Sequence, residues 1–216
     1  MIGFSDKRRR MVREQIEARE VRDLFVLKAM EKVPRHLFVP EAMLDRAYED
    51  SPLPIGHKQT ISQPYTVAFM TEALELTGKE KVLEIGAGSG YQAAILAELA
   101  GEIYTIERIP ELAEQAEKIL KQLGYKNIRI KVGDGSLGWA EQSPFQAIIV
   151  TAGAPAIPKP LLEQLDDPGL LVIPVGDRSS QNMIRVRKKN QKVTEESLGP
   201  FRFVELIGEH GHQKND

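Results

Sequence analysis

Lys-Val-Leu-Glu-Ile-Gly-Ala-Gly-Ser-Gly, residues 81–90, combines a short apolar run with three glycines at alternate positions. Val82, Leu83 and Ile85 are typical of a strand that is buried on both faces of a parallel sheet. The apolar pattern of Tyr91–Ala100 predicts a helix directly after the glycines. Because glycine adopts backbone angles barred to other residues and has no side chain, a ligand can approach the main chain at this turn. The stretch therefore indicates a nucleotide-binding strand, turn and helix.

The spacing of the glycines distinguishes between ligand classes. A dinucleotide fingerprint, G-x-G-x-x-G, would need its third glycine where Tyr91 stands, and a phosphate-binding loop would need a lysine after the glycines. The remaining pattern, G-x-G-x-G after an acidic strand, resembles the S-adenosylmethionine loop of Rossmann-like methyltransferases. On this resemblance four residues are candidates for cofactor binding: Glu84, Gly86, Ala87 and Gly88. Three glycines are also compatible with a purely structural turn.

A second acidic residue favours the cofactor interpretation. Glu102–Arg108 alternates like a strand and carries Glu107 near its end. A carboxylate at a strand tip can accept hydrogen bonds from both hydroxyls of a ribose, as in other nucleotide-binding folds. Glu107 is therefore a candidate ribose ligand, and the alternative is a solvated acid at the end of a strand.

Length and composition limit the class of protein. The 216 residues are enough for one ordinary domain with a small appendage, and 42% hydrophobic and 28% charged residues are typical of a globular protein. No apolar run approaches the roughly twenty residues of a membrane span. Met1–Arg10 contains Asp-Lys-Arg-Arg-Arg and lacks the apolar core of a signal peptide. We therefore expect a cytoplasmic protein without a membrane partner.

The absence of cysteine excludes several kinds of site. Disulfides, cysteine-ligated zinc and cysteine nucleophiles are ruled out. The four histidines lack H-E-x-x-H spacing, so we expect no metal. A net charge of −2 argues against a dedicated nucleic-acid surface. The basic run Lys7–Arg10 lies on a predicted exposed helix, where such charges are usually solvated.

Tyr48–Thr66 predicts an irregular loop in front of a helix. Its prolines and glycine oppose regular structure, and loops of this length in compact domains are usually functional. Pro64 suits the first helical position, so Thr60 and Ser62 come just ahead of a helix N-terminus. Unpaired helix N–H groups and two hydroxyls can together bind a carboxylate. The residues leave open whether they do so, or whether Ser62 or Gln63 only caps the helix.

The remaining stretches alternate between helix and strand. Helices are predicted at Ser5–Arg19, Leu24–Val33, Pro110–Leu123 and Pro158–Leu165, and strands at Asn127–Val132, Phe145–Thr151 and Leu170–Val175. Three strand-like runs without helices between them follow at Met183–Arg187, Lys192–Glu195 and Phe201–Ile207. The pattern predicts a doubly wound, Rossmann-like α/β sheet with an N-terminal helical cap and C-terminal antiparallel strands. We expect residues 1–76 to carry the cap and loop, 77–180 the cofactor-binding core, and 181–216 the strands that complete the same domain.

Gly133-Asp134-Gly135 follows the strand Asn127–Val132. An aspartate at a strand tip can accept a hydrogen bond from an adenine amino group, but Asp-Gly is equally typical of a plain turn. Its place on the same sheet edge as the glycine turn and Glu107 favours the ligand. Asp134 and Gly135 therefore join the candidate cofactor-binding residues.

Four motifs together resemble one family. They are Asp-Ser-Pro-Leu-Pro-Ile-Gly-His-Lys-Gln-Thr-Ile-Ser-Gln-Pro (50–64), Val-Leu-Glu-Ile-Gly-Ala-Gly-Ser-Gly-Tyr (82–91), Tyr-Thr-Ile-Glu-Arg (104–108) and Gly-Asp-Gly-Ser-Leu-Gly-Trp (133–139). From about Arg35 to Gly176 the chain resembles the protein-L-isoaspartate (D-aspartate) O-methyltransferases, and the Thr-Ile-Ser-x-Pro loop is particular to that family. The sequence departs from the family pattern at Asp166-Asp167-Pro168-Gly169. Its tail after Ile207 is not matched closely enough to assign His210 or His212.

The resemblance implies an activity and its cofactor. The enzyme would transfer a methyl group from S-adenosylmethionine to the free α-carboxylate of L-isoaspartyl and D-aspartyl residues in damaged peptides and proteins, with S-adenosylhomocysteine as product. The ester would collapse to a succinimide and so initiate repair. In the family, the position matching Asp134 contacts the adenosyl part. We expect Ser62 and Thr60 to orient the acceptor, Ser62 also to border the cofactor, and the enzyme to be a monomer.

Two other functions are compatible with the residues. A methyltransferase for RNA or a small molecule would use the same glycine turn. Ala-Gly-Ala-Pro, however, stands after Thr151 where amino methyltransferases resemble one another in an Asn/Asp-Pro-Pro-Tyr sequence. A non-catalytic module would bind S-adenosylmethionine without turnover.

Overall fold

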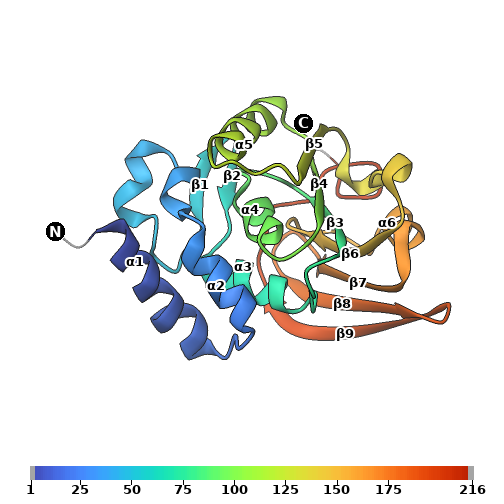
Figure 1. The fold of residues 1–216 in the computed structure, drawn as a ribbon. Coiled ribbons are helices and arrows are strands. Elements are labelled where there is room, and N and C mark those ends of the chain that lie inside the picture. Colours follow the sequence, from blue (N-terminus) through green and yellow to red (C-terminus); the bar gives the residue numbers. More distant parts are fainter. Residues whose placement is uncertain (1–2, 214–216) are drawn as a thin grey trace.

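A seven-stranded sheet forms the centre of the molecule (Figure 1). It is seen in a computed structural model that describes residues 3–213. The strands are β3 (Lys81–Ile85), β4 (Glu102–Glu107), β5 (Ile128–Val132), β6 (Phe145–Val150), β7 (Leu165–Gly176), β8 (Gln181–Lys189) and β9 (Lys192–Phe201). Their order is β5-β4-β3-β6-β7-β8-β9, and the first five are parallel. The predicted doubly wound α/β sheet is confirmed.

The order of the strands creates a switch point between β3 and β6. From β3 the chain builds outward through β4 to β5, and it then returns to add β6 on the other side of β3. In open parallel sheets, ligands bind beyond the carboxyl ends of the strands at such a point. The glycine turn follows β3 directly, so it lies at this position.

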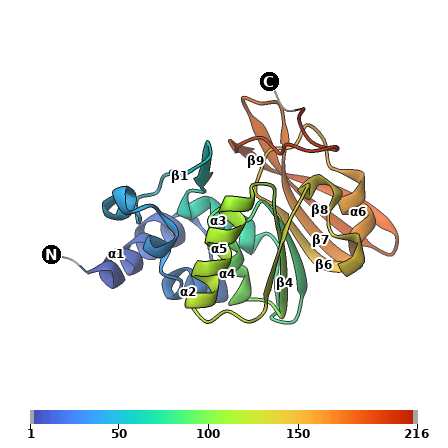
Figure 2. The ribbon, with the colours of Figure 1, turned by 90° about the horizontal axis from the view of Figure 1, so that it is seen from above.

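Helices cover both faces of the sheet. Successive side chains along a strand point to opposite faces, so both faces carry apolar residues that helices bury. Val82 and Ile103 contribute to a core on one face, which includes α3 (Pro64–Glu72), α4 (Tyr91–Ala97) and α5 (Pro110–Gln122). Leu83 and Tyr104 point to the opposite face, where α6 (Lys159–Gln164) packs. Figure 2 shows α3, α4 and α5 on one side of the strands and α6 on the other.

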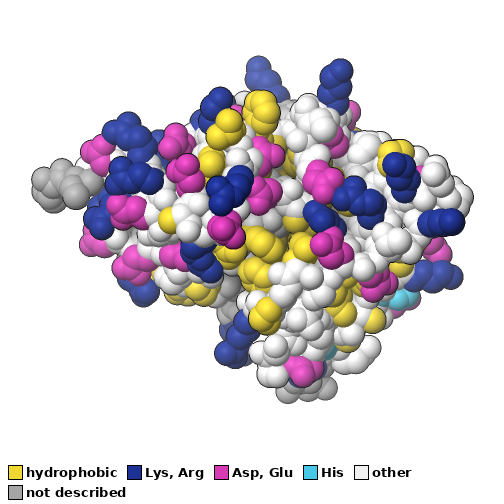
Figure 3. Space-filling view, turned by 90° about the horizontal axis from the view of Figure 1, so that it is seen from below, with side chains coloured by type: hydrophobic (Ala, Val, Ile, Leu, Met, Phe, Trp, Pro, Cys, Tyr) yellow, Lys and Arg dark blue, Asp and Glu magenta, His cyan; other side chains and the backbone are white. Residues whose placement is uncertain are grey.

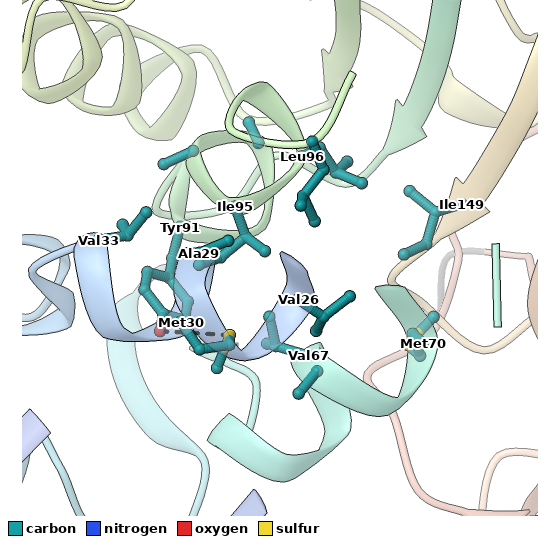
Figure 4. Packing of buried hydrophobic residues seen from close by; sticks show 14 of the residues in the cluster. Val26, Ala29, Met30, Val33, Val67, Met70, Tyr91, Ile95, Leu96 and Ile149 are labelled. Carbon is teal, nitrogen blue, oxygen red and sulfur yellow. Dashed lines mark hydrogen bonds between the residues drawn. The ribbon is translucent and has the colours of Figure 1, made fainter. Parts of the chain in front are cut away.

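The N-terminal helices share the larger of these two cores. They are α1 (Phe4–Met11), which continues through a π-helical turn at Val12–Ile16 and a 3-10 turn at Glu17–Arg19, and α2 (Leu24–Lys32). Side chains of α2, α3, α4 and β6 meet in one cluster, in which the Tyr91 hydroxyl donates to Met30 Sδ over 3.9 Å (Figure 4). As predicted, Asp23 caps α2, since its carboxylate accepts from the amides of Phe25 and Val26.

The loop at Tyr48–Thr66 is more regular than we predicted. Leu53–Gly56 (β1) and Gln59–Ile61 (β2) form an antiparallel hairpin, so the expectation of irregular structure throughout is wrong. Pro54 is tolerated because a two-stranded hairpin leaves one edge of each strand open. His57 and Lys58 make the two-residue turn with φ values of 50° and 58°.

The C-terminal ribbon is confirmed in part. β8 pairs antiparallel with β7 and β9 with β8, as predicted. Phe201–Ile207, however, is not a third strand, because residues 204–206 leave the ribbon and exchange backbone hydrogen bonds with Gly153. Asp167, where the sequence departs from the family pattern, accepts hydrogen bonds from the amides of Asn190 and Gln191 in the β8–β9 turn.

The surface mixes charges of both signs. On the face seen from below, Lys and Arg side chains are interspersed with Asp and Glu, and hydrophobic side chains gather in a band near the centre (Figure 3). Within residues 3–213, no helix has the length and apolar character needed to cross a membrane.

Candidate active site

A cleft lies beyond the carboxyl ends of β3, β4 and β6. Its empty volume, open solvent included, is about 810 Å³. Seven residues proposed from the sequence line it: Thr60, Ser62, Gly86, Ala87, Gly88, Glu107 and Gly135. The C-terminal segment Val204–Ile207 forms another part of its wall. Segments distant in the sequence thus meet at the switch point of the sheet.

The glycine turn uses its own amides to fasten itself to β4. The amides of Gly86 and Ala87 donate to the carbonyl of Ile106 over 2.8 and 3.2 Å. The amide of Gly88 donates to Oε2 of Glu107 over 2.8 Å. A pyrophosphate would need such amides as donors. The turn therefore offers a close-fitting surface more than an anion site, which agrees with rejecting the dinucleotide pattern.

Two of the glycines are required by their surroundings. Gly86 has a φ of 96°, and a Cβ atom there would lie 2.5 Å from Oγ1 of Thr151. Gly90 has a φ of 86°, and its Cβ atom would lie 3.1 Å from Cβ of Ala116. A side chain at either position would be strained by its backbone angle and crowded by a neighbour.

Glu107 lies at the tip of β4 and borders the cleft. One carboxylate oxygen accepts from the amide of Gly88 and the other from the amide of Ile109 over 2.9 Å. An ionised carboxylate has about four acceptor sites, so both oxygens can accept further hydrogen bonds. The solvated-acid alternative does not describe this residue, because its side chain is 6% exposed.

Glu84 is buried in the sheet and does not line the cleft. It is fully enclosed, and neither carboxylate oxygen has a hydrogen-bond partner within residues 3–213. Burial is the main cause that raises the pKa of Glu84 to about 8, and the nearby Glu107 carboxylate acts in the same direction. Because side chains alternate along β3, Glu84 points to the same face as Val82, beneath α4. With this pKa the Glu84 side chain is mostly protonated at pH 7, and it lies behind the residues that line the cleft.

Asp134 is held by the chain itself. Its Oδ1 accepts from the amide and hydroxyl of Ser136 over 2.8 and 2.7 Å, and its Oδ2 accepts from the amide of Glu209 over 2.7 Å. Partial burial opposes ionisation, but these hydrogen bonds lower the pKa of Asp134 overall. The turn alternative thus describes the geometry seen here, while Gly135 borders the cleft. An adenine contact of Asp134 stays a prediction.

The helix α3, which follows the loop Tyr48–Ser62, is capped by a residue that we did not predict. Oδ1 of Asp50 accepts from the amide of Tyr65 in α3 over 3.2 Å. Its Oδ2 accepts from Nε2 of Gln63 and from Nη1 of Arg19, each over 2.7 Å. Neither Ser62 nor Gln63 caps the helix with its side chain within the described residues. The Ser62 hydroxyl is therefore left available to the cleft.

A second cleft opens next to the first. Its empty volume, open solvent included, is about 1550 Å³. It is bordered by aromatic side chains of α3 (Tyr65 and Phe69), of the end of β9 (Phe201) and of the segment after β9 (Phe203). Four residues line both clefts: Thr60, Ser62, Thr151 and Val204. The two spaces thus meet at a junction that carries three hydroxyl groups. We call these spaces the inner and the outer cleft.

Sequence reasoning missed Asp50, Thr151 and the segment Val204–Ile207. Asp50 begins the longest motif of the chain, and Thr151 ends a predicted strand at the ligand edge of the sheet, so both carried a weak signal. Nothing local marked residues 204–207, because their place depends on hydrogen bonds to Gly153.

Comparison with known proteins gives a consistent result. Residues 6–211 match the family described as Protein-L-isoaspartate(D-aspartate) O-methyltransferase (PCMT). The protein-L-isoaspartate O-methyltransferase of Syntrophus aciditrophicus (strain SB) is 58% identical over 214 residues, covering 98% of each chain. Protein-L-isoaspartate O-methyltransferase 2 of Geotalea uraniireducens (strain Rf4) is 58% identical over 217 residues, covering 100% of each chain.

Two solved structures resemble the fold. A protein-L-isoaspartate O-methyltransferase has a TM-score of 0.85 at 27% identity, covering 94% of this chain and 67% of the other. A putative protein-L-isoaspartate O-methyltransferase of Plasmodium falciparum, in complex with S-adenosyl-L-homocysteine, has a TM-score of 0.81 at 24% identity, covering 93% and 98%. Together with the family match over nearly the whole sequence, these findings mean that the chain belongs to the protein-L-isoaspartate(D-aspartate) O-methyltransferase family.

Proposed function

We propose that the enzyme transfers a methyl group from S-adenosylmethionine to the free α-carboxylate of L-isoaspartyl and D-aspartyl residues in damaged peptides and proteins. The product ester would then start repair through a succinimide. The observation that carries this proposal is the junction of the two clefts, where Thr60 and Ser62 border both spaces. A donor in the inner cleft and an acceptor in the outer cleft would meet at these hydroxyls.

The residues of the inner cleft fit S-adenosylmethionine, which supplies the methyl group as a sulfonium when it is bound. Glu107 can accept the ribose hydroxyls at the tip of β4, and the glycine turn gives close backbone contact. We keep Glu84, which is buried in β3 just before the glycine turn, as a further proposed cofactor residue. Gly135 borders the same space, and we keep Asp134 as a further proposed contact of the adenosyl group.

The acceptor needs orientation more than activation. A carboxylate is ionised at pH 7, so no general base has to remove a proton from it. The half-buried Ser62 and the exposed Thr60 can each donate one hydrogen bond to the carboxylate oxygens. Two moderate hydrogen bonds hold the nucleophile in line without neutralising its charge. Bringing opposite charges together also reduces the cost of excluding water from the junction.

The outer cleft suits a peptide chain. Its aromatic border is formed by side chains from α3, from the end of β9 and from the segment that follows it. Such a surface can hold an extended, flexible stretch on either side of the isoaspartyl residue without reading a strict sequence. We further propose that the enzyme works in the cytoplasm as a monomer. We also propose that it has no nucleic-acid partner, which its net charge of −2 supports.

Paired peptides test the proposed function. They would be identical except for an isoaspartyl or an aspartyl linkage, and transfer of labelled methyl from S-adenosylmethionine would be measured as base-labile methanol. We expect transfer to the isoaspartyl peptide alone. Binding of S-adenosylhomocysteine without transfer to either peptide would overturn the assigned acceptor, and the search would move to RNA and small molecules.

A further inference from the structure

Thr151 supplies the third hydroxyl at the junction of the clefts, and the proposed reaction gives it no role. It follows β6 directly, while Thr60 lies in β2 and Ser62 follows that strand. Hydroxyls from separate parts of the chain therefore meet at the switch point between β3 and β6, where this fold binds its ligand.

The Thr151 side chain is tied to the backbone at the end of β3. Its Oγ1 lies 2.9 Å from the carbonyl oxygen of Ile85 and 2.7 Å from that of Gly86. Its amide also donates to the Ile85 carbonyl over 2.9 Å. A hydroxyl has one proton, so it donates to one of the two carbonyls at a time. Thr151 thus holds the first peptide units of the glycine turn against the end of β6.

Gly86 and Thr151 form a matched pair. A Cβ atom on Gly86 would lie 2.5 Å from the Thr151 hydroxyl oxygen, closer than unbonded atoms approach. The first glycine of the turn is therefore needed for two separate reasons, its φ of 96° and the space occupied by Thr151. The hydroxyl of Thr151 consequently fills the position that a side chain on the turn would occupy.

We propose that Thr151 is a positioning residue for methyl transfer. Through its bond to the Gly86 peptide it fixes the turn that holds the donor, and it borders both the inner and the outer cleft where they meet. It thereby sets where the donor lies relative to Thr60 and Ser62. The part that concerns the turn stands independently, whereas the part that concerns the acceptor rests on the proposed function.

Two substitutions separate the hydroxyl from the shape of the side chain. Thr151→Val keeps the shape and removes the hydroxyl, while Thr151→Ser keeps the hydroxyl. In Thr151→Val we expect the Kd of S-adenosylhomocysteine, measured by calorimetry, to rise about tenfold, in line with one lost hydrogen bond. The kcat should fall more than about tenfold because small displacements of reacting groups are costly. Thr151→Ser should stay within about threefold of the wild type in both quantities.

The control is Thr194→Val, which alters an exposed threonine of β9 away from both clefts and should change neither quantity. Unchanged kcat and Kd in Thr151→Val, or equal losses in the Val and Ser variants, would overturn the proposal. If the isoaspartyl peptide is not methylated by the wild type but Thr151→Val still weakens S-adenosylhomocysteine binding, the proposed function fails and the role in the turn stands.

A double-mutant cycle provides a readout that does not depend on turnover or on the Val variant folding. Gly86→Ala should weaken S-adenosylhomocysteine binding less in a Thr151→Ala background than in the wild type, because the crowding is relieved and only the φ strain remains. Strictly additive losses would contradict the pairing of Gly86 with Thr151.

Discussion

Individual side chains at the junction of the clefts are expected to affect donor binding and methyl transfer differently. Ser62 borders both clefts and does not cap α3, since Asp50 does so. Under the proposed function, a hydroxyl in that place would orient the acceptor and contribute little to the affinity for the donor. The two effects can be separated by measurement.

We expect Ser62→Ala to lower kcat by about ten- to a hundredfold, the usual effect of losing a hydrogen bond to a charged group. The Kd of S-adenosylhomocysteine should change by less than about threefold. Steady-state kinetics with an isoaspartyl peptide and calorimetry measure the two quantities. Ser197→Ala, on the exposed surface of β9, is the matched control. An unchanged kcat would remove Ser62 from the acceptor site.

Glu84 links a single side chain to the pH dependence of stability. Its folded-state pKa is raised to about 8 from an ordinary value of 4.5. The folded protein therefore binds the proton more tightly than the unfolded chain does. The contribution of neutral Glu84 to stability is complete below about pH 4.5 and is lost as the pH rises through about 8.

We expect the free energy of unfolding of the wild type to fall relative to that of Glu84→Gln as the pH rises across this interval. The slope of the difference would be at most about 1.4 kcal/mol per pH unit. Urea unfolding followed by the fluorescence of Trp139, the single tryptophan, measures both proteins. Parallel curves for the two would show that Glu84 does not titrate in this way.

At the level of elements, α3 is positioned by residues that lie outside the helix. Asp50 caps its N-terminus and at the same time binds Arg19, at the end of the N-terminal helical segment. The guanidinium of Arg19 also stacks on the ring of Tyr65, 3.5 Å from its centroid. The carboxylate of Asp50 thus connects the start of α3, and the loop before it that carries Thr60 and Ser62, to the N-terminal helices.

Asp50→Ala should destabilise the protein by about 1 kcal/mol, the usual effect of losing a helix cap. It should also raise the KM for the peptide, because the loop that carries Thr60 and Ser62 loses its anchor. Asp50→Asn retains a capping oxygen and should keep most of the stability. Asp45→Ala, at an exposed position nearby, serves as control. A loss of stability in Asp50→Asn as large as in Asp50→Ala would assign the effect to the ion pair with Arg19 instead.

The helices and strands also differ in how well they could be predicted from the sequence. The strands β3 to β6 and the helices between them follow from apolar periodicity and from glycine and proline positions, which are local signals. The β1–β2 hairpin was missed because its prolines suggested a break, whereas a free edge accommodates Pro54. The cap by Asp50 and the bond from Thr151 to Gly86 join residues far apart in the chain, so no local pattern contains them.

For the molecule as a whole, the C-terminal segment closes the site. It is held at one end by hydrogen bonds with Gly153 and at the other by Asp134 and Ser136, which accept from the amides of Glu209 and His210. Val204–Ile207 lies between these anchors and lines the inner cleft. The wall of the cleft therefore depends on residues at both ends of the segment.

Gly208→Val should release one anchor, because any side chain at this position would collide with the Asp134 carboxylate and the Ser136 hydroxyl. We expect the Kd of S-adenosylhomocysteine to rise by at least about tenfold, while far-UV circular dichroism stays unchanged. Glu209→Ala keeps the backbone amide that Asp134 accepts and should bind as the wild type does. Normal affinity in Gly208→Val would mean that the segment does not contribute to the site.

The glycine turn also affects which adenosine compounds we expect the inner cleft to bind. The amides of Gly86, Ala87 and Gly88 already serve the end of β4, so these three amides offer no free donor to the phosphates of ATP, which would lose hydration at the turn. The Glu107 carboxylate beside them would add repulsion. A cell contains ATP in abundance, and it shares its adenosine half with the methyl donor. We therefore expect the few hydrogen bonds that hold the turn in place to select against the commonest nucleotide in a cell.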